Sequence, residues 1–231
     1  MNISFLENLA ANQDLESALY QLSRHINDRI VFSTSFGIED QVIAHAIFSQ
    51  QLKNIAVFTL DTGRLFPETY DVWDKTVLRY KAEIKAYYPN AADLENFIDH
   101  NGINAFYNSQ ELRKECCFLR KVNPLKRALK DAKIWITGVR AEQSESRNEL
   151  SVIQWDEQYQ LYKYNPLLHW SAEDVAKYIK EHGITYNHLH DQGFVSIGCA
   201  PCTRAIKTGE SFRDGRWWWE DSSKKECGLH K

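Results

Sequence analysis

The residues of this chain with the clearest chemistry are its five cysteines. Two are adjacent, Cys116 and Cys117, and two form a Cys-x-x-Cys pair, Cys199 and Cys202. Cys-x-x-Cys is a common half-site for zinc or an iron–sulfur cluster, and four thiolates are enough ligands for either. Adjacent cysteines reach one centre only if the backbone turns sharply between them. A redox-active Cys199–Cys202 pair and buried, unreactive thiols are the alternatives, and spacing does not choose iron from zinc.

The fifth cysteine, Cys227, stands in the stretch KKECGLHK close to the end of the printed sequence. Lys224, Lys225 and His230 flank it, and nearby cations favour the thiolate, which is the nucleophilic form. The alternative is an incidental exposed cysteine. The stretch around it, ESFRDGRWWWEDSSKKECGLHK, has no long periodic run, so we predict a C-terminal extension over 211–231 that is mobile at its end.

A candidate anion-binding turn lies in VFSTSFGIED, where a buried strand is followed by small residues and then a helix. Ligands of parallel sheets bind beyond the carboxyl ends of the strands, and amides at a helix N-terminus favour anions. We therefore predict a phosphate or sulfate site formed by Ser33, Ser35, Phe36 and Gly37. An ordinary capped turn is the alternative, since the stretch matches neither the Walker A pattern nor GxGxxG.

Two further strand ends carry polar residues that could meet the same ligand. LDTGRLFPETY places Asp61 after a second strand, beside Leu60, and ITGVRAEQSESR supplies Gly138, Arg140 and Arg147 after a third. Arginine binds oxyanions in a planar and often bidentate way. The alternatives are a simple turn at Asp61 and a solvated arginine face.

Apolar periodicity predicts strands that alternate with helices. Helices are expected at 6–26, 38–52, 67–81, 123–133 and 171–183, and strands at 29–35, 54–60, 83–89 and 134–140. Such alternation predicts an α/β fold, with a mostly parallel twisted sheet and helices on both faces. We expect one domain over 1–210, opened by an N-terminal helix within 1–28, and then the extension 211–231.

Composition narrows the functional classes. The 231 residues are 43% hydrophobic and carry a net charge of −3, which argues against a general nucleic-acid binder. Neither a signal peptide nor a membrane-spanning stretch is expected, so we predict a cytoplasmic protein with reduced thiols, no membrane partner and no nucleic-acid partner.

Taken together, the motifs resemble the assimilatory adenylyl-sulfate / phosphoadenylyl-sulfate reductase family. STSFGIED, LDTGRLFPETY, ECCFLRKVNPL, TGVRAEQSESR, GCAPCTR, GRWWWE and KKECGLH occur in this order between about residues 29 and 230. The resemblance implies an adenine-nucleotide α-hydrolase-like fold, related to the ATP pyrophosphatases. The SGGxDS loop of those relatives reads STSFGIED here, which favours the reductase branch over ATP adenylation.

The resemblance also implies a cofactor and a substrate. Members with both cysteine pairs hold a 4Fe-4S cluster, which assigns Cys116, Cys117, Cys199 and Cys202 to metal binding. These members resemble adenylyl-sulfate (APS) reductases, so APS is the expected substrate. Use of the 3′-phosphorylated compound PAPS, alone or together with APS, is the alternative.

The mechanism implied by the resemblance gives Cys227 the nucleophilic role. Its thiolate would take the sulfonate of APS to form S-sulfocysteine, and thioredoxin or glutaredoxin would then release sulfite. Lys121, Arg213, Arg216 and His230 would bind the sulfate or phosphate. Ser33, Ser35, Phe36, Gly37, Leu60, Asp61, Gly138, Arg140 and Arg147 would form the rest of the substrate site. We further expect a homo-oligomer.

Two rival functions remain at this point. An iron–sulfur tRNA sulfur-transfer enzyme would be expected to carry an SGGxDS loop and a basic surface, and this sequence has neither the loop nor a basic balance. A four-cysteine zinc module would normally have its cysteine pairs much closer together in sequence.

Overall fold

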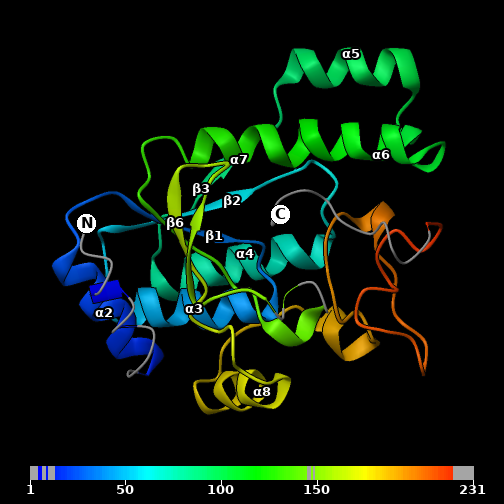
Figure 1. Ribbon diagram of the computed structural model, residues 1–231. Helices are drawn as coiled ribbons and strands as arrows, with labels where there is room; N and C mark the ends of the chain where they lie inside the picture. Colours follow the sequence, from blue (N-terminus) through cyan, green and yellow to red (C-terminus); the bar gives the residue numbers. More distant parts are fainter. Residues whose placement is uncertain (1–4, 7–8, 10–13, 145–146, 148, 221–231) are drawn as a thin grey trace. The chain divides into compact units, whose positions relative to one another are not determined.

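The computed structural model describes residues 5–6, 9, 14–144, 147 and 149–220 (Figure 1). Its chain divides into two compact units. Unit 1 consists of residues 1–58, 68–85 and 131–187, and unit 2 of residues 59–67, 86–130 and 188–231. Each unit is thus assembled from three separate stretches of sequence. Cys227 and His230 lie outside the described residues. The predicted boundary at residue 210 between body and extension stays a prediction.

A six-stranded sheet has the order β3-β2-β1-β4-β6-β5. Its strands are β1 Ile30–Thr34, β2 Ile55–Leu60, β3 Lys85–Tyr87, β4 Ile134–Ile136, β5 Ile153–Asp156 and β6 Leu161–Tyr164. β4 pairs in parallel with both β1 and β6, with Ile134 opposite Ile30 and Tyr162. β5 is antiparallel to β6. The fold is therefore α/β with a mostly parallel sheet, as the alternating sequence pattern predicted.

Unit 1 is built on helices that cover a buried apolar strand. Its helices include α2 Leu15–His25, α3 Ile38–Ser49, α4 Pro67–Tyr80 and α8 Ala172–Glu181. Helix α3 contacts β1, α2 and α8, and its buried side chains occur all around the helix, so its apolar residues are not confined to one face.

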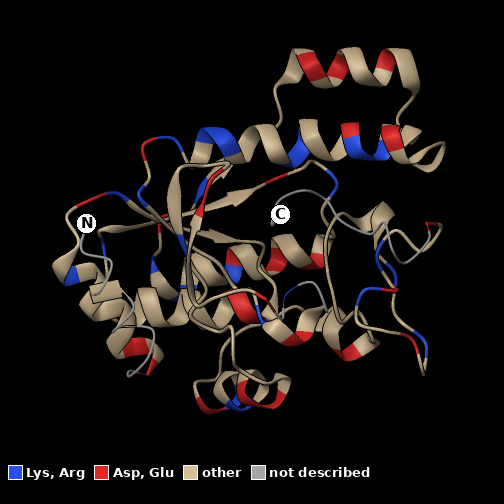
Figure 2. Ribbon diagram, viewed as in Figure 1, with Lys and Arg blue, Asp and Glu red and all other residues tan. Residues whose placement is uncertain are grey.

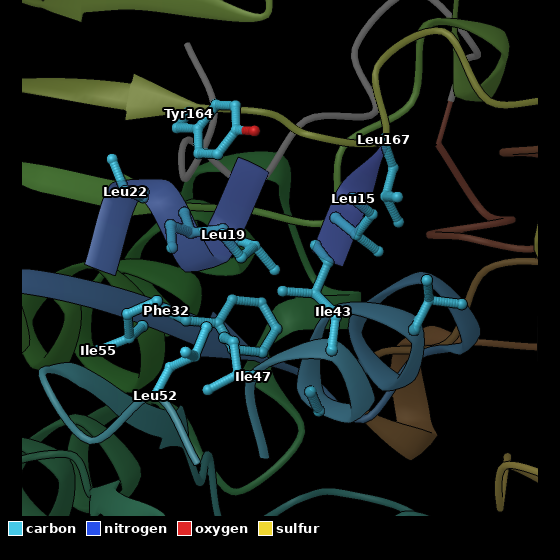
Figure 3. Close-up of a cluster of buried hydrophobic side chains, with 14 of the residues drawn as sticks. Leu15, Leu19, Leu22, Phe32, Ile43, Ile47, Leu52, Ile55, Tyr164 and Leu167 are labelled. Carbon is cyan, nitrogen blue, oxygen red and sulfur yellow. The ribbon is translucent and has the colours of Figure 1, made fainter. Parts of the chain in front are cut away.

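The core of unit 1 gathers side chains from these elements (Figure 3). Leu19 and Leu22 of α2, Phe32 of β1 and Ile43 of α3 are all fully buried. Burial of a large aliphatic or aromatic side chain contributes about 1.5–3 kcal/mol to stability. This cluster holds the carboxyl end of β1 and the start of α3 in place, and so fixes the turn between them.

The regular structure of unit 2 is mainly helical. Helix α5 is Ala91–Asn101, capped by the side chain of Asn90, and α6 is Gln110–Cys117, capped by Ser109. A π-helical segment, Phe118–Val122, continues α6 into α7, Asn123–Ala128. Pro124 lacks an N–H and cannot complete the α-helical ladder, which accounts for the looser turn just before it. Short 3-10 turns occur at Ala105–Tyr107, His188–Gln192 and Ala200–Cys202, with another in unit 1 at Ala141–Gln143.

The predicted elements compare well with the structure, with specific misses. The predicted strand at 83–89 shrinks to β3, and the helix predicted over 123–133 ends at Ala128. Elements α5, α6, β5 and β6 were not predicted, because Asn, Asp and Glu dilute their periodicity or because they are short. None of the helices in the described ranges is long and apolar enough to cross a membrane.

A titratable ring in unit 1 makes the stability of the fold depend on pH. The rings of His45 and His182 lie 4.8 Å apart, and His45 Nδ1 is 2.7 Å from the hydroxyl of Tyr80. Burial, followed by the charges of His182 and Arg79, lowers the pKa of His45 below its usual value, against the opposing effect of Glu16. The folded state therefore disfavours the imidazolium. This contribution to stability is present above the ordinary histidine pKa and is lost as the pH falls below it.

His45→Gln is accordingly expected to weaken the acid sensitivity of folding. The wild-type unfolding temperature should drop more than that of H45Q between about pH 7.5 and about pH 5.5, measured by circular dichroism. His169→Gln, which changes an exposed histidine of the same unit, is the control. Parallel curves for wild type and H45Q would rule out His45 as the group responsible.

Candidate active site

Both cysteine pairs line one pocket within unit 2. The lining residues are Arg64, Phe106, Arg113, Cys116, Cys117, Arg120, Lys121, Cys199, Pro201 and Cys202. Four thiols, four cationic side chains and little else of polar character thus surround the same space. The structure brings together the four cysteines and the lysine that the sequence had singled out.

The helical stretch from α6 onward explains how adjacent cysteines serve one pocket. Arg113, Cys116, Cys117, Arg120 and Lys121 are spaced by 3, 1, 3 and 1 residues, and this spacing places side chains on one face of a helix. Figure 2 shows basic residues recurring along this stretch. A helix therefore replaces the sharp backbone turn that adjacent cysteines had seemed to require. The same periodicity, read in the sequence, could have identified the two arginines.

Main-chain contacts hold the Cys-x-x-Cys turn. Cys199 O accepts hydrogen bonds from Cys202 N at 3.0 Å and from Thr203 Oγ1 at 2.9 Å. The hydroxyl of Tyr107 donates to Pro201 O at 2.7 Å, and Trp217 N donates to Cys202 O at 3.1 Å. The turn is thereby tied both to the start of α6 and to the tryptophan segment that follows it in the chain.

The four thiols sit in unequal electrostatic surroundings. Burial, reinforced by the neighbouring Cys199 and Cys117, raises the pKa of Cys202 to about 12. Burial also raises the pKa of Cys116. Burial opposes ionisation of Cys199 too, but Lys121, the Thr62 hydroxyl and Arg216 outweigh it and lower the pKa of that thiol. A full set of thiolates in this pocket thus requires further positive charge, which a bound metal centre would supply.

Buried hydrogen-bond donors around the pocket indicate that an anionic group belongs there. Arg120 Nε, Arg216 Nε and Trp217 Nε1 are buried and have no hydrogen-bond partner among the described residues. Unsatisfied buried donors are costly, so they commonly mark a missing ligand. In the described part of the chain, no group of three or more His, Cys, Asp or Glu is placed to hold a single metal ion.

Arg216 is held close to this pocket by a glycine. A Cβ at Gly198 would lie 2.2 Å from Arg216 Nη2 and 2.6 Å from Arg216 Cζ, so glycine leaves room for the guanidinium in this position beside Cys199. The guanidinium carbons of Arg216 and Arg213 lie 4.9 and 5.8 Å from the ring centre of Trp217. Both arginines predicted from the GRWWWE motif are therefore stacked on the tryptophan that covers Cys202.

The predicted anion turn is found in unit 1, between β1 and α3. Phe36 adopts a left-handed backbone conformation, with φ of 59°, and stacks on Trp73. Gly37 is the N-cap of α3 and supplies no side-chain cap, so no cap side chain accepts from the first helical amides. That these amides bind an anion stays a prediction.

One donor of the turn is already engaged, by a residue that the sequence reading missed. Asp40 Oδ2 accepts hydrogen bonds from Ser35 N at 2.6 Å and Ser35 Oγ at 2.7 Å. A Cβ at Gly138 would lie 2.2 Å from Asp40 Oδ1, so Gly138 provides the space for this carboxylate. Ser33 Oγ likewise accepts a hydrogen bond from Trp135 Nε1 at 2.8 Å. The serine hydroxyls therefore shape the turn as much as they offer donors to a ligand.

Arg140 and Arg147 are tied to neighbouring side chains. Arg140 is buried and forms ion pairs with Glu39 at 2.9 Å and Glu142 at 2.8 Å, and Arg147 donates to Gln143. Carboxylates that pair with a buried arginine reduce the charge it can offer to a second anion. These contacts hold the loop after β4 against the start of α3.

Leu60 and Asp61 belong to unit 2, where they end β2. Leu60 is half-buried and Asp61 is buried. Asp61 Oδ1 accepts a hydrogen bond from Gly63 N at 2.8 Å, and Asp61 N donates to Tyr87 O at 3.1 Å. The carboxylate thus starts a turn, and that turn carries Thr62 and Arg64 to the cysteine pocket.

Comparison with solved structures defines the class of fold. The structure superposes on FMN adenylyltransferase of Candida glabrata with a TM-score of 0.55 at 17% identity, covering 94% of this chain and 73% of that one. It superposes on phosphoadenylyl-sulfate (PAPS) reductase of Candida auris, a phosphate complex, with a TM-score of 0.73 at 26% identity, covering 89% and 98%. The fold is the adenine-nucleotide α-hydrolase-like one.

The family follows from sequence comparison. Residues 29–205 match the phosphoadenosine phosphosulfate reductase domain. Adenosine 5′-phosphosulfate reductase of Burkholderia cepacia is 46% identical over 222 residues, which cover 96% of this chain and 88% of that protein. The chain belongs to the phosphoadenosine phosphosulfate reductase family.

The buried carboxyl of the anion turn leads to a prediction about stability. Burial, against the opposing Ser35 hydrogen bonds and with help from Glu39, raises the pKa of Asp40 to about 6. Its contribution to stability is therefore full below the ordinary aspartate pKa and is lost as the pH rises through about 6. Between about pH 4 and about pH 7 the wild type should lose roughly 2 kcal/mol relative to Asp40→Asn.

Urea unfolding at each pH measures this difference. Asp71→Asn, which changes an exposed carboxylate of α4 in the same unit, should follow the wild type. A difference between wild type and D40N that does not vary with pH would show that Asp40 is not buried in the way described.

Proposed function

We propose that this protein reduces adenosine 5′-phosphosulfate to sulfite and AMP, in the assimilation of sulfate. The observation that carries the proposal is the identity of 46% over nearly the whole chain with an adenosine 5′-phosphosulfate reductase. The likeness to a PAPS reductase structure, at 26% identity, is weaker and leaves PAPS as the alternative substrate. The four-thiol pocket supports APS, because the resemblance associates both cysteine pairs with the APS-using branch.

We propose that Cys116, Cys117, Cys199 and Cys202 hold a 4Fe-4S cluster. The support is their common pocket, its cationic lining and its unpaired buried donors, described above. A cluster bound there would supply a fixed charge and a rigid connection between the two cysteine pairs. The reaction needs only the two electrons of a dithiol reductant, so no electron transfer through the cluster is required.

The chemical work is assigned to Cys227. Its thiolate attacks the sulfur of APS, the new bond joins Cys227 Sγ to that sulfur, and the bond from sulfur to the phosphate oxygen breaks. AMP leaves with the electron pair of the broken bond. The product on the protein is S-sulfocysteine, the covalent intermediate of a nucleophilic thiol mechanism.

Thioredoxin, or glutaredoxin, is the proposed reductant. One of its thiolates attacks Cys227 Sγ, so that sulfite leaves with the electron pair of the S–S bond and a mixed disulfide remains. The second thiolate of the reductant then attacks the reductant's sulfur in the mixed disulfide. This step forms a disulfide within the reductant and releases Cys227 as a thiolate. Two electrons have then passed from the dithiol to sulfur, and atoms and charges balance. We also propose that the protein is cytoplasmic, because such dithiols are kept reduced there. We propose further that it is a homo-oligomer.

The positive groups of unit 2 are proposed to offset the repulsion between thiolate and sulfate. Lys121 lines the cysteine pocket, and Arg213 and Arg216 stack on Trp217 beside it. His230 is proposed to assist at the phosphate or at Cys227. Fixed cations at the reacting group stabilise charge that shifts during transfer, without reorganisation at that moment.

The nucleotide part of APS is assigned to the strand-end residues. Gly37 and the amides that follow it offer the phosphate an anion site. The remaining substrate-binding assignments are Ser33, Ser35, Phe36, Leu60, Asp61, Gly138, Arg140 and Arg147. Because Ser35 and Arg140 already have protein partners, we propose that they act mainly by shaping the turn.

A single-turnover experiment tests the proposed function. Anaerobically purified protein mixed with APS, without reductant, should gain one SO3 unit in its intact mass and lose it on adding reduced thioredoxin. Cys227→Ser should gain nothing, because it lacks the nucleophile. An adduct from PAPS but not from APS would reverse the substrate assignment, and no adduct from either would refute the reductase proposal.

Replacement of Lys121 tests the proposal that cations of unit 2 offset the repulsion between thiolate and sulfate. Lys121→Ala is expected to slow adduct formation at saturating APS by about 100-fold, the usual cost of removing one fixed charge-stabilising donor. Iron content should not change. Lys126→Ala, at an exposed position on α7, is the matched control. Rates for K121A equal to those of K126A would remove Lys121 from the mechanism.

A further inference from the structure

A buried ion pair in unit 2 is not explained by the functions assigned so far. Arg113 Nε donates to Glu220 Oε1 at 2.9 Å, and Arg113 Nη2 donates to Glu220 Oε2 at 2.8 Å. The arginine side chain is 0% exposed and the glutamate side chain 9% exposed. Such a two-point pairing of guanidinium and carboxylate fixes direction as well as distance.

The arginine end of the pair belongs to the wall of the cysteine pocket. Arg113 lies on α6, one helical turn before Cys116 and Cys117, and lines the pocket with them. Its guanidinium carbon also lies 4.6 Å from the ring centre of Trp217. The position of Arg113 is therefore set by the same helix that presents the cysteine pair.

The glutamate end belongs to the stretch that leads to Cys227. Glu220 N donates to Trp217 O at 2.8 Å, which closes a turn directly after the tryptophan segment. Glu220 is the last described residue, and Cys227 follows it by seven positions in the sequence. A seven-residue stretch spans at most about 25 Å, so the place of Glu220 bounds the region in which the thiol can act.

We infer that the Arg113–Glu220 pair is a positioning device for the nucleophilic thiol. The pair attaches Glu220, which precedes Cys227 by seven residues, to helix α6, which carries Cys116 and Cys117. The inference rests on the proposed function, since it assumes that Cys227 is the nucleophile. Anchoring a short tether raises the effective concentration of the group at its end, and small misplacements of reacting groups slow reactions steeply.

A purely structural ion pair is the competing explanation, and unit 2 offers a matched control. Arg204 Nη1 and Nη2 donate to Glu210 Oε2 and Oε1 at 2.7 and 2.8 Å, which is the same two-point pairing. Neither residue lines the cysteine pocket. Loss of this second pair, whose side chains are 31% and 26% exposed, removes a contact of the same two-point geometry without touching the origin of the Cys227 segment.

The experiment compares three variants of the full chain, purified anaerobically. Glu220→Gln removes the carboxylate but keeps the size of the side chain. Arg113→Lys keeps the positive charge but loses the planar guanidinium that donates both hydrogen bonds. Glu210→Gln is the control. Two readouts are combined: the rate of SO3 adduct formation at saturating APS without reductant, and the APS dissociation constant of each variant in a Cys227→Ser background. Iron per chain is determined for every sample.

The inference predicts that E220Q and R113K form the adduct at least about tenfold more slowly than wild type. Their APS dissociation constants should stay within about twofold of wild type, since neither residue belongs to the nucleotide turn. E220Q should also keep its iron, because Glu220 does not line the cysteine pocket. E210Q should match the wild type in every readout. A slow rate with unaltered affinity and iron content is not what a general loss of structure produces.

Three results would overturn the inference that the Arg113–Glu220 pair positions the thiol. Wild-type rates in E220Q and R113K would show that the pair does not position the thiol. Rate losses that follow lost iron or weakened APS binding would make the pair a structural one, as would failure of both variants to fold. Absence of an adduct in the wild type itself would instead refute the proposed function, so the two failures can be told apart.

Discussion

Buried thiols become thiolates only where positive charge compensates them, and this constraint organises unit 2. Taking four thiolates out of water is prohibitive unless cations or a metal centre lie beside them. Four cationic side chains line the pocket beside the thiols: Arg64, Arg113, Arg120 and Lys121. Those cations are themselves costly to bury, and two of them have close partners: Arg113 is paired with Glu220, and Arg120 donates to Thr62 O at 2.6 Å. Cysteines, cations and their partners therefore form one interdependent set.

The same constraint explains local departures from regular structure. The helix from α6 to α7 must present cysteines and cations on one face over more than two turns, and its π-helical segment lies at the residues that carry Arg120 and Lys121. Glycine at position 198 leaves room for the guanidinium of Arg216 beside it. Irregularities of this kind are where local preference yields to a functional arrangement.

The sequence predicted those parts of the protein that depend on short-range patterns. The strand β1, the turn after it and the capped helix α8 were placed correctly, because apolar runs, small turn residues and a Ser-x-x-Asp cap act locally. Pairing of Asp40 with Ser35, and of Arg140 with Glu39, was not foreseen. Such partners are chosen by the folded chain, and a sequence shows only that a charged residue is present, not which neighbour it meets.

The cysteines illustrate both sides of this limit. Their types and spacing were enough to predict one shared centre, and the structure places all four along one pocket. Arg64 and Phe106 were missed, since they come from separate stretches that only the fold unites. Arg113 was missed although its helical spacing from Cys116 and Cys117 is visible in the sequence. The division of the chain into two units, each made of three stretches, was equally invisible to a search for linkers.

The central claim is that the two cysteine pairs hold one iron–sulfur cluster that organises the surrounding charge. Iron, zinc and acid-labile sulfide per chain, determined on anaerobically purified protein together with its Mössbauer spectrum, test it most directly. The account predicts about four iron atoms and four sulfides per chain in a single four-iron environment. One zinc ion per chain without sulfide, or no bound metal in folded protein, would contradict it.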